Sequence, residues 1–136
     1  MRVALVNPAW NYDGSIYFGC REEHLPLELG YAKALLERAG VEARMFDGQL
    51  EGLDNAGLAR VVAAFGPDIT VVTTAPTYLF WRCAPPELRI PREFLAALDG
   101  RGGREVAVGP HASATPGITL RKLGCEIVVR GECEET

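Results

Sequence analysis

Two glycine-containing segments, each directly after a short apolar run, are the parts of this sequence best suited to chemistry. Gly109-Pro110-His111-Ala112 follows the run Val106-Ala107-Val108, and Arg130-Gly131-Glu132 follows Ile127-Val128-Val129. In α/β domains, small molecules bind at the carboxyl ends of strands, where loops converge and backbone amides are free. The two segments therefore predict a ligand-binding site.

Two longer connections complete the predicted site. One runs from Pro8 to Leu25 and the other from Ala75 to Ile90. Loops of this length in a compact domain are usually functional or disordered, and aromatic residues argue against disorder. These aromatic residues are Trp10, Tyr12, Tyr17, Phe18, Tyr78, Phe80 and Trp81. The candidate ligand-binding residues here are Asn7, Pro8, Trp10, Asp13, Gly14, Ser15, Thr73, Thr74, Ala75 and Pro76.

Strands and helices alternate along the chain. Short apolar or β-branched runs predict strands at 2–7, 41–46, 69–74, 105–108 and 126–129. Helical spacing predicts helices at 26–39 and 91–98, one after an Asp54 N-cap that ends at Gly66, and one at 116–123 with Thr115 as N-cap. Short connections between such elements imply a parallel sheet covered on both faces.

The expected fold is a flavodoxin-like, Rossmann-like α/β three-layer sandwich with a five-stranded parallel sheet in the order 2-1-3-4-5. Its topological switch point lies between the first and third strands, where the two long loops begin. A chain of 136 residues is expected to form one domain, since that length buries roughly 68 to 70% of the unfolded surface.

Composition excludes several classes of protein. The net charge is −4 and no Lys/Arg cluster occurs, so nucleic-acid binding is not expected. No apolar run approaches the ~18 residues of a membrane span. The apolar stretch at the amino terminus is too short for a signal peptide. We expect a cytoplasmic protein. The four cysteines have no zinc or redox spacing, so no protein metal site is predicted.

Familiar cofactor and catalytic motifs are missing from the predicted loops. The loop after residue 7 has no Gly-x-Gly-x-x-Gly for a dinucleotide, and no acidic pair for phosphotransfer. His24 and His111 are the only histidines, and neither lies near a Gly-x-Ser-x-Gly elbow. We therefore predict no catalytic residue in this chain. Small residues, amides and aromatic edges favour a large, flat, mostly apolar cofactor.

The chain resembles the amino-terminal cobalamin-binding domain of cobalamin-dependent radical SAM proteins. The resemblance rests on Val6-Asn7-Pro8, Leu25-Pro26-Leu27-Glu28-Leu29-Gly30-Tyr31-Ala32, Gly109-Pro110-His111-Ala112 and Val129-Arg130-Gly131-Glu132. It implies a flavodoxin-like domain that holds cobalamin for a methyltransferase. S-adenosylmethionine and a 4Fe-4S cluster would belong to a separate radical SAM domain of the same parent chain. The cluster motif Cys-x-x-x-Cys-x-x-Cys is not in this sequence, so the chain is expected to be the cobalamin-holding portion alone, without turnover.

The sequence also bears on whether the protein supplies a histidine to cobalt on the lower face of the cofactor. Asp47-Gly48-Gln49-Leu50-Glu51-Gly52 imitates the Asp-x-His-x-x-Gly motif of other cobalamin domains, with glutamine for histidine. It follows the second predicted strand instead of the first, so we interpret it as coincidence. The resemblance implies cobalamin bound without a protein histidine, which favours methyl transfer because axial donors set the reactivity of the metal.

Each candidate residue also has a structural interpretation. His111 could ligate cobalt, line the nucleotide tail or donate to a carbonyl, and Gly109 could serve close approach or only a turn. Thr73 and Thr74 could face the ligand or merely finish a β-branched strand.

The loop residues carry similar alternatives. Trp10, Phe80 and Trp81 could cover the corrin, face another domain or form a local cluster. Asp13-Gly14-Ser15 predicts a turn, with Ser15 as a possible donor, and Arg130-Gly131-Glu132 is either a site segment or a surface turn. Glu132, Glu134 and Glu135 are expected to form a solvated tail. A flavodoxin-like protein-interaction domain that self-associates through Tyr78, Phe80 and Trp81 is the alternative function.

Overall fold

The computed structural model describes residues 1–11, 25–76 and 88–132 of the chain. Its sheet contains five parallel strands in the order β2-β1-β3-β4-β5, which confirms the predicted fold and its switch point between β1 and β3. The strands are β1 (Arg2–Asn7), β2 (Glu42–Asp47), β3 (Ile69–Thr73), β4 (Arg104–Val108) and β5 (Ile127–Val128).

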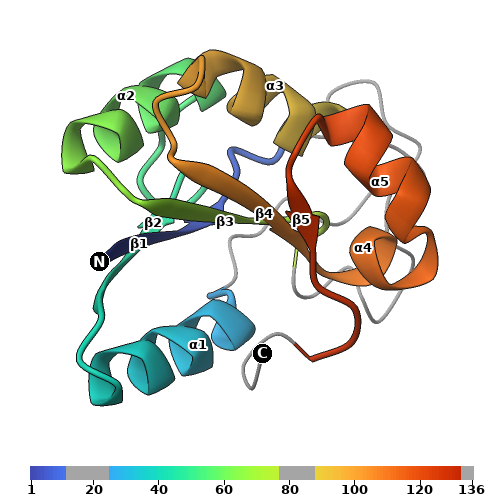
Figure 1. Ribbon diagram of the computed structural model, residues 1–136. Helices are drawn as coiled ribbons and strands as arrows, with labels where there is room; N and C mark the ends of the chain where they lie inside the picture. Colours follow the sequence, from blue (N-terminus) through green and yellow to red (C-terminus); the bar gives the residue numbers. More distant parts are fainter. Residues whose placement is uncertain (12–24, 77–87, 133–136) are drawn as a thin grey trace.

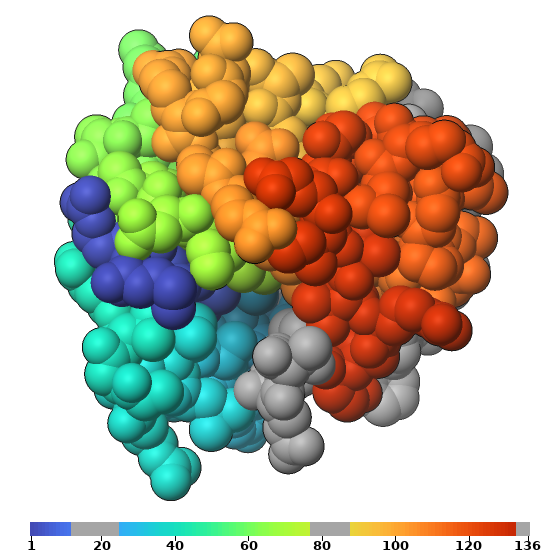
Figure 2. Space-filling model, viewed as in Figure 1, coloured from blue at the N-terminus to red at the C-terminus, as the bar shows by residue number. Residues whose placement is uncertain are grey.

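Helices cover the two faces of the sheet unequally. They are α1 (Leu27–Arg38), α2 (Asn55–Phe65), α3 (Arg89–Leu98), α4 (Pro110–Ala114) and α5 (Pro116–Leu123). Figure 1 shows α2 and α3 on one face and α1 on the other, below β1 and β2. In the space-filling view of Figure 2, α4, α5 and the segment after β5 form the right-hand side of the molecule, and α1 lies at the lower left.

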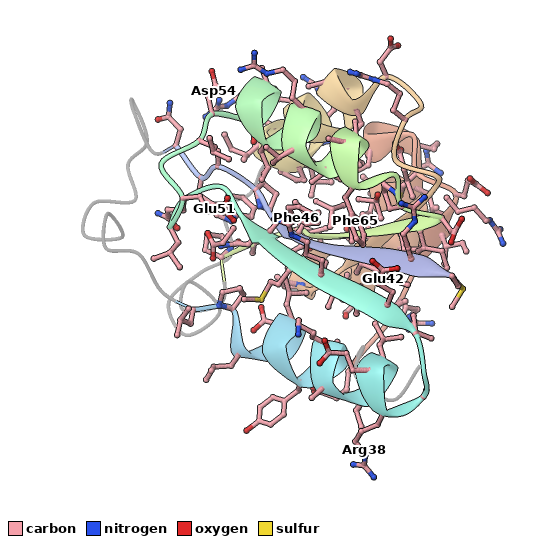
Figure 3. The ribbon with its side chains drawn as sticks, turned by 90° about the vertical axis from the view of Figure 1, so that its left-hand side faces the viewer. Arg38, Glu42, Phe46, Glu51, Asp54 and Phe65 are labelled. Atoms are coloured by element: carbon pink, nitrogen blue, oxygen red, sulfur yellow. The ribbon has the colours of Figure 1, made fainter. Side chains whose placement is uncertain are left out.

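Apolar burial on both faces of the sheet holds these layers together. The larger core lies between the sheet and α2 and α3, and it includes the fully buried Phe46, Leu58, Val72 and Phe94. Phe46 and Phe65 pack with ring centroids 5.6 Å apart, and Figure 3 shows these two side chains between β2 and α2. The smaller core joins α1 to the sheet through Val3, Leu5, Leu29 and Ala32.

Local signals set most helix ends as expected. The Asp54 carboxylate accepts a hydrogen bond from the Gly57 amide at 2.6 Å, which satisfies a donor in the first turn of α2. Gly66 ends that helix in the left-handed conformation. At the end of α1, the amide of Gly40, with a φ of 77°, donates to the Glu37 carbonyl at 3.0 Å.

Three local predictions were wrong. Residues 110–114 form α4 instead of a loop, because Gly109 leaves β4 with a φ of 105° and Pro110 then sets a helical first turn. Thr115 makes no side-chain cap, since its hydroxyl donates backward to the His111 carbonyl at 3.3 Å. The edge strand β5 contains only Ile127 and Val128.

Among the described residues, we find no helix that combines the length and the apolar character needed to cross a membrane.

Candidate functional site

The carboxyl ends of β3 and β4 are joined by main-chain and side-chain contacts. The Thr74 amide and hydroxyl both donate to the Val108 carbonyl, each at 2.9 Å. A Cβ atom on Gly109 would lie 2.9 Å from Thr74 Oγ1. The glycine is therefore required both by its positive φ and by its close approach to Thr74. Thr74 and Gly109 are therefore structural partners that join the carboxyl ends of β3 and β4.

Thr73 differs from its neighbour. It is 2% exposed, and its hydroxyl has no hydrogen-bond partner among the residues that the structure describes. A buried hydroxyl without a partner costs about 1 to 3 kcal/mol. Strand alternation places Thr73 on the same side of the sheet as Val71, which packs against the α1 core. A polar group left unsatisfied at a topological switch point suits a ligand-binding role.

A serine links the ends of β4 and β5. Ser113 Oγ donates to the Gly109 carbonyl at 3.1 Å and accepts from the Gly131 amide at 2.9 Å. Ser113 therefore fixes the segment that contains Arg130 and Glu132 beside α4. We did not single out Ser113 from the sequence, although it lies four residues after Gly109, which is the spacing of one helical turn.

The candidates after β4 and β5 differ in exposure. Ala112 is fully buried and Pro110 is half-buried, whereas Arg130, Gly131 and Glu132 are exposed. In the part of the chain that the structure describes, no atom beyond the adjacent residues lies within 4 Å of a Cβ atom built on Gly131. The turn after β5 therefore presents open surface next to the buried ends of β3 and β4.

The half-buried His111 joins α4 to α5. Its carbonyl accepts from Thr119 Oγ1 at 2.9 Å and from the Thr115 amide at 2.9 Å. Within the described part of the chain, no group of three His, Cys, Asp or Glu residues could hold a metal ion. The hydroxyls of Thr74, Ser113 and Thr119 all donate to main-chain carbonyls, so they serve as structural donors.

The ends of β1 and β2 carry a separate buried network. Trp10 Nε1 donates to Asn7 Oδ1 at 2.7 Å, and Asn7 Nδ2 donates to Asp47 Oδ2 at 3.0 Å. Asn7, Asp47 and Trp10 are 3%, 4% and 8% exposed, and Pro8 is also buried. Asn7 and Trp10 are predicted site residues, whereas Asp47 belongs to the segment that we interpreted from the sequence as a coincidental motif.

A groove of about 560 Å³ lies beside this network, between the turn after β2 and the first turns of α2 and α3. Trp10, Gln49, Asn55 and Arg89 are among the residues that line it. In Figure 3, the turn that carries Glu51 lies at the end of β2 and Asp54 lies at the start of α2, which places these segments on one edge of the sheet.

Among the described residues, the groups whose pKa is clearly shifted lie at the amino-terminal ends of β4 and β5. Burial raises the pKa of Glu105, near the start of β4, and the neighbouring Glu126 raises it further. Burial also raises the pKa of the Cys125 thiol. A thiol with a raised pKa is less reactive, so Cys125 is a structural cysteine.

Several predicted site residues lie outside the described residues. These are Asp13, Gly14 and Ser15 of the first long loop, together with Tyr78, Phe80 and Trp81 of the second. Ala75 and Pro76, which begin the second loop, are buried at the end of β3. The structure thus brings together the ends of β3, β4 and β5, with the ends of β1 and β2 alongside.

Comparison with known proteins gives one sequence relative and several structural neighbours, whereas no family model matches the chain. A protein of Pyrococcus horikoshii described as an uncharacterized methyltransferase is 30% identical over 114 residues, which is 82% of this chain and 23% of that protein. The chain therefore spans about a quarter of the length of this relative.

Two solved structures share the fold of this chain. Both are of the radical S-adenosylmethionine methyltransferase TsrM from Kitasatospora setae, one with cobalamin and a 4Fe-4S cluster bound and one with tryptophan substrate and the SAM analog aza-SAM bound. Each matches with a TM-score of 0.71 and 23% identity, over 98% of this chain and 24% of the TsrM chain. At this identity the likeness establishes the flavodoxin-like fold.

Proposed function

We propose that residues 1–136 form a cobalamin-binding domain of a longer enzyme that transfers methyl groups. Two comparisons support this: the fold extends over nearly all of this chain in TsrM, which was solved with cobalamin, and the Pyrococcus relative is named as a methyltransferase. In the proposed parent chain, a radical SAM domain would hold S-adenosylmethionine and the 4Fe-4S cluster. The domain described here would hold the cobalamin.

The observation that carries the proposal is the hydroxyl of Thr73, which is buried and has no hydrogen-bond partner among the described residues. It lies at the switch point, where ligands of doubly wound folds bind, and it is buried beside the small residues Ala75 and Pro76. A cofactor amide or phosphate oxygen could complete its hydrogen bonding. One available hydroxyl among small apolar residues fits a large cofactor that is recognised through a few polar contacts.

The other residues at this edge would shape the site. Cobalamin, when bound, supplies a cobalt centre that can carry a methyl group. Ala75 would provide apolar contact and exclude water, while the open surface at Gly131 would admit a bulky ring. Ser113 would hold the turn at Gly131 in place through its 2.9 Å hydrogen bond.

A direct binding experiment tests this function. The purified chain is mixed with hydroxocobalamin, desalted and examined by visible absorption, with titration to measure Kd. We expect corrin absorbance to remain with the protein, and Thr73→Val to weaken binding. A folded chain that retains no corrin at micromolar concentration would contradict cobalamin binding by this domain.

A second candidate function is self-association without a cofactor, and the outer face of α1 favours it. Leu27, Tyr31 and Leu35 lie four residues apart on that helix and are 63%, 66% and 39% exposed. Apolar residues at this spacing form one stripe along a helix, and exposed apolar stripes mark interaction surfaces. Figure 2 shows α1 at the surface of the molecule.

Sedimentation distinguishes the two candidates. If self-association is the function, the chain forms a dimer that Tyr31→Glu dissociates, and cobalamin changes neither state. A monomer at high micromolar concentration would rule out this second candidate. A monomer that binds hydroxocobalamin is the result that we expect.

A further inference from the structure

We infer that Asn7 acts as a positioning residue that fixes the start of the loop after β1, and that it does so through Trp10 and Asp47. This inference rests on the proposed cobalamin function, because β1 ends at the switch point where the cofactor is proposed to bind. It assigns Asn7 a role different from the direct cofactor contact predicted from the sequence. We call the three residues Asn7, Asp47 and Trp10 the β1–β2 clamp.

Every polar atom of the Asn7 side chain is used within the clamp. Its amide nitrogen donates to Asp47 Oδ2 at 3.0 Å, and its amide oxygen accepts from Trp10 Nε1 at 2.7 Å. Its main-chain carbonyl accepts from the Gly48 amide at 3.0 Å. At 3% exposure, Asn7 is committed to contacts within the protein.

The chemistry of the two partners admits only one orientation of this amide. An indole nitrogen can only donate, and an ionised carboxylate can only accept. Position 7 therefore requires a short side chain with one donor and one acceptor, which is what asparagine offers. A carboxylate at position 7 would face the Asp47 carboxylate and lose the donor.

The clamp extends from the ends of two strands into two connections. Asp47 Oδ1 accepts from the amides of Gln49 and Leu50 at 3.1 and 2.9 Å, which shapes the turn after β2. On the other side, Trp10 lies three residues after Asn7, in the first residues of the connection that follows β1. Fixing the indole therefore fixes the direction in which the chain leaves β1.

Close packing reinforces the clamp at the neighbouring positions. The Ala9 amide donates to Asn55 Oδ1 at 3.1 Å, so the first residues of the loop are also held to α2. A Cβ atom on Gly48 would lie 3.0 Å from the Ala9 nitrogen and 2.9 Å from a Leu58 methyl carbon. The two connections thus touch along their main chains, and a change at Asn7 would be transmitted to both.

Exchanging the amide of Asn7 and the carboxylate of Asp47 tests the clamp, with hydroxocobalamin as the probe. Asn7→Asp places two carboxylates side by side, and we expect it to weaken hydroxocobalamin binding by about tenfold or more, as for the loss of a hydrogen bond to a charged group. Combining Asn7→Asp with Asp47→Asn restores one donor and one acceptor in every contact. We expect this double variant to recover the wild-type Kd to within about threefold.

A second readout reports on the clamp without cobalamin. Trp10 and Trp81 are the only tryptophans, so a Trp81→Phe background leaves the emission of Trp10 alone. We expect Asn7→Asp to increase acrylamide quenching of Trp10 and the double variant to reverse the increase. Thr70→Val, which removes a buried hydrogen bond at the opposite end of β3, serves as the control and should leave Kd unchanged.

The outcomes separate the inference from the proposed function. Wild-type protein that binds no hydroxocobalamin contradicts the function, whatever the variants do. Wild-type binding that Asn7→Asp, confirmed as folded by circular dichroism, leaves unaltered overturns the positioning role, and so does a folded double variant that fails to recover. If Asn7→Asp does not fold, Trp10→Phe removes the indole donor and part of the ring while keeping an aromatic side chain, and an unchanged Kd for that variant would equally overturn the inference.

Discussion

Exchanging Thr73 and Thr70 for valine in separate variants distinguishes a ligand-binding hydroxyl from a structural one. Both threonines lie on β3, are 2% and 0% exposed, and lose only a hydroxyl in exchange for a methyl group. Thr70 Oγ1 donates to the Gly102 carbonyl at 2.6 Å, whereas the Thr73 hydroxyl has no hydrogen-bond partner within the described residues. The same substitution should therefore lower stability at Thr70 and ligand affinity at Thr73.

We expect one variant to lose stability and the other to lose affinity for hydroxocobalamin. Thr70→Val removes a buried hydrogen bond at a cost of about 1 to 3 kcal/mol, which lowers Tm by roughly 3 to 12 °C for a chain of this length. Thr73→Val removes a buried hydroxyl that has no hydrogen-bond partner among the described residues, so the free energy of unfolding should stay constant or rise by about 1 kcal/mol. Hydroxocobalamin affinity should fall about 5- to 30-fold for Thr73→Val, which corresponds to about 1 to 2 kcal/mol, and stay constant for Thr70→Val.

Thermal unfolding followed by circular dichroism measures the first effect, and absorption titration with hydroxocobalamin measures the second. A Thr73→Val protein that loses as much stability as Thr70→Val would show that the Thr73 hydroxyl has a structural partner, and the premise would be wrong. A Thr73→Val protein that binds hydroxocobalamin as tightly as wild type would refute the ligand-binding role of this hydroxyl.

Two further predictions concern the opposite edge of the sheet. Gly103→Ala should cost well over the roughly 1 to 2 kcal/mol of a left-handed alanine, because the new Cβ would lie 2.3 Å from the Asp68 carbonyl oxygen, whereas Gly100→Ala, with a similar φ and open space, should cost only that strain. Glu105→Gln should raise Tm near pH 7 and have no effect near pH 4. Burial, with a smaller contribution from Glu126, raises the pKa of Glu105 in the folded state, so the stabilisation it contributes is complete below its unfolded pKa and is lost as pH rises through the folded pKa.

Urea unfolding checks the glycine pair, and equal losses for the two alanine variants would contradict the packing argument at Gly103. Thermal unfolding at several pH values checks Glu105. A Tm gain for Glu105→Gln that is the same near pH 4 and near pH 7 would show that the effect does not arise from titration of this carboxyl.

Much of the fold followed from local patterns. The apolar runs at β1 and β3 predicted buried parallel strands, and Asp54 and Gly66 predicted the two ends of α2, because caps act through neighbouring backbone groups. The short helix α4 was missed because its five residues are too few to show a helical period.

The site could be predicted only in outline. Strand ends after β1, β3, β4 and β5 were identified because parallel strands deliver their carboxyl ends to one edge. Which side chains serve the protein and which remain available depends on long-range contacts. Thr74 bonds to Val108, 34 residues away, and Asn7 bonds to Asp47, 40 residues away.

The sequence by itself determined the order of elements and the parallel sheet, because periodicity and caps depend on short stretches of chain, and it predicted a ligand site at the carboxyl ends of the strands. Only the tertiary structure decided the roles of adjacent residues there. Thr73 and Thr74 are the same amino acid in succession, yet one hydroxyl is bonded and the other has no partner among the described residues. That difference arises because Thr73 is the last residue of β3 and shares the α1 face of the sheet with Val71, whereas Thr74 lies just past the strand and reaches the Val108 carbonyl at the end of β4.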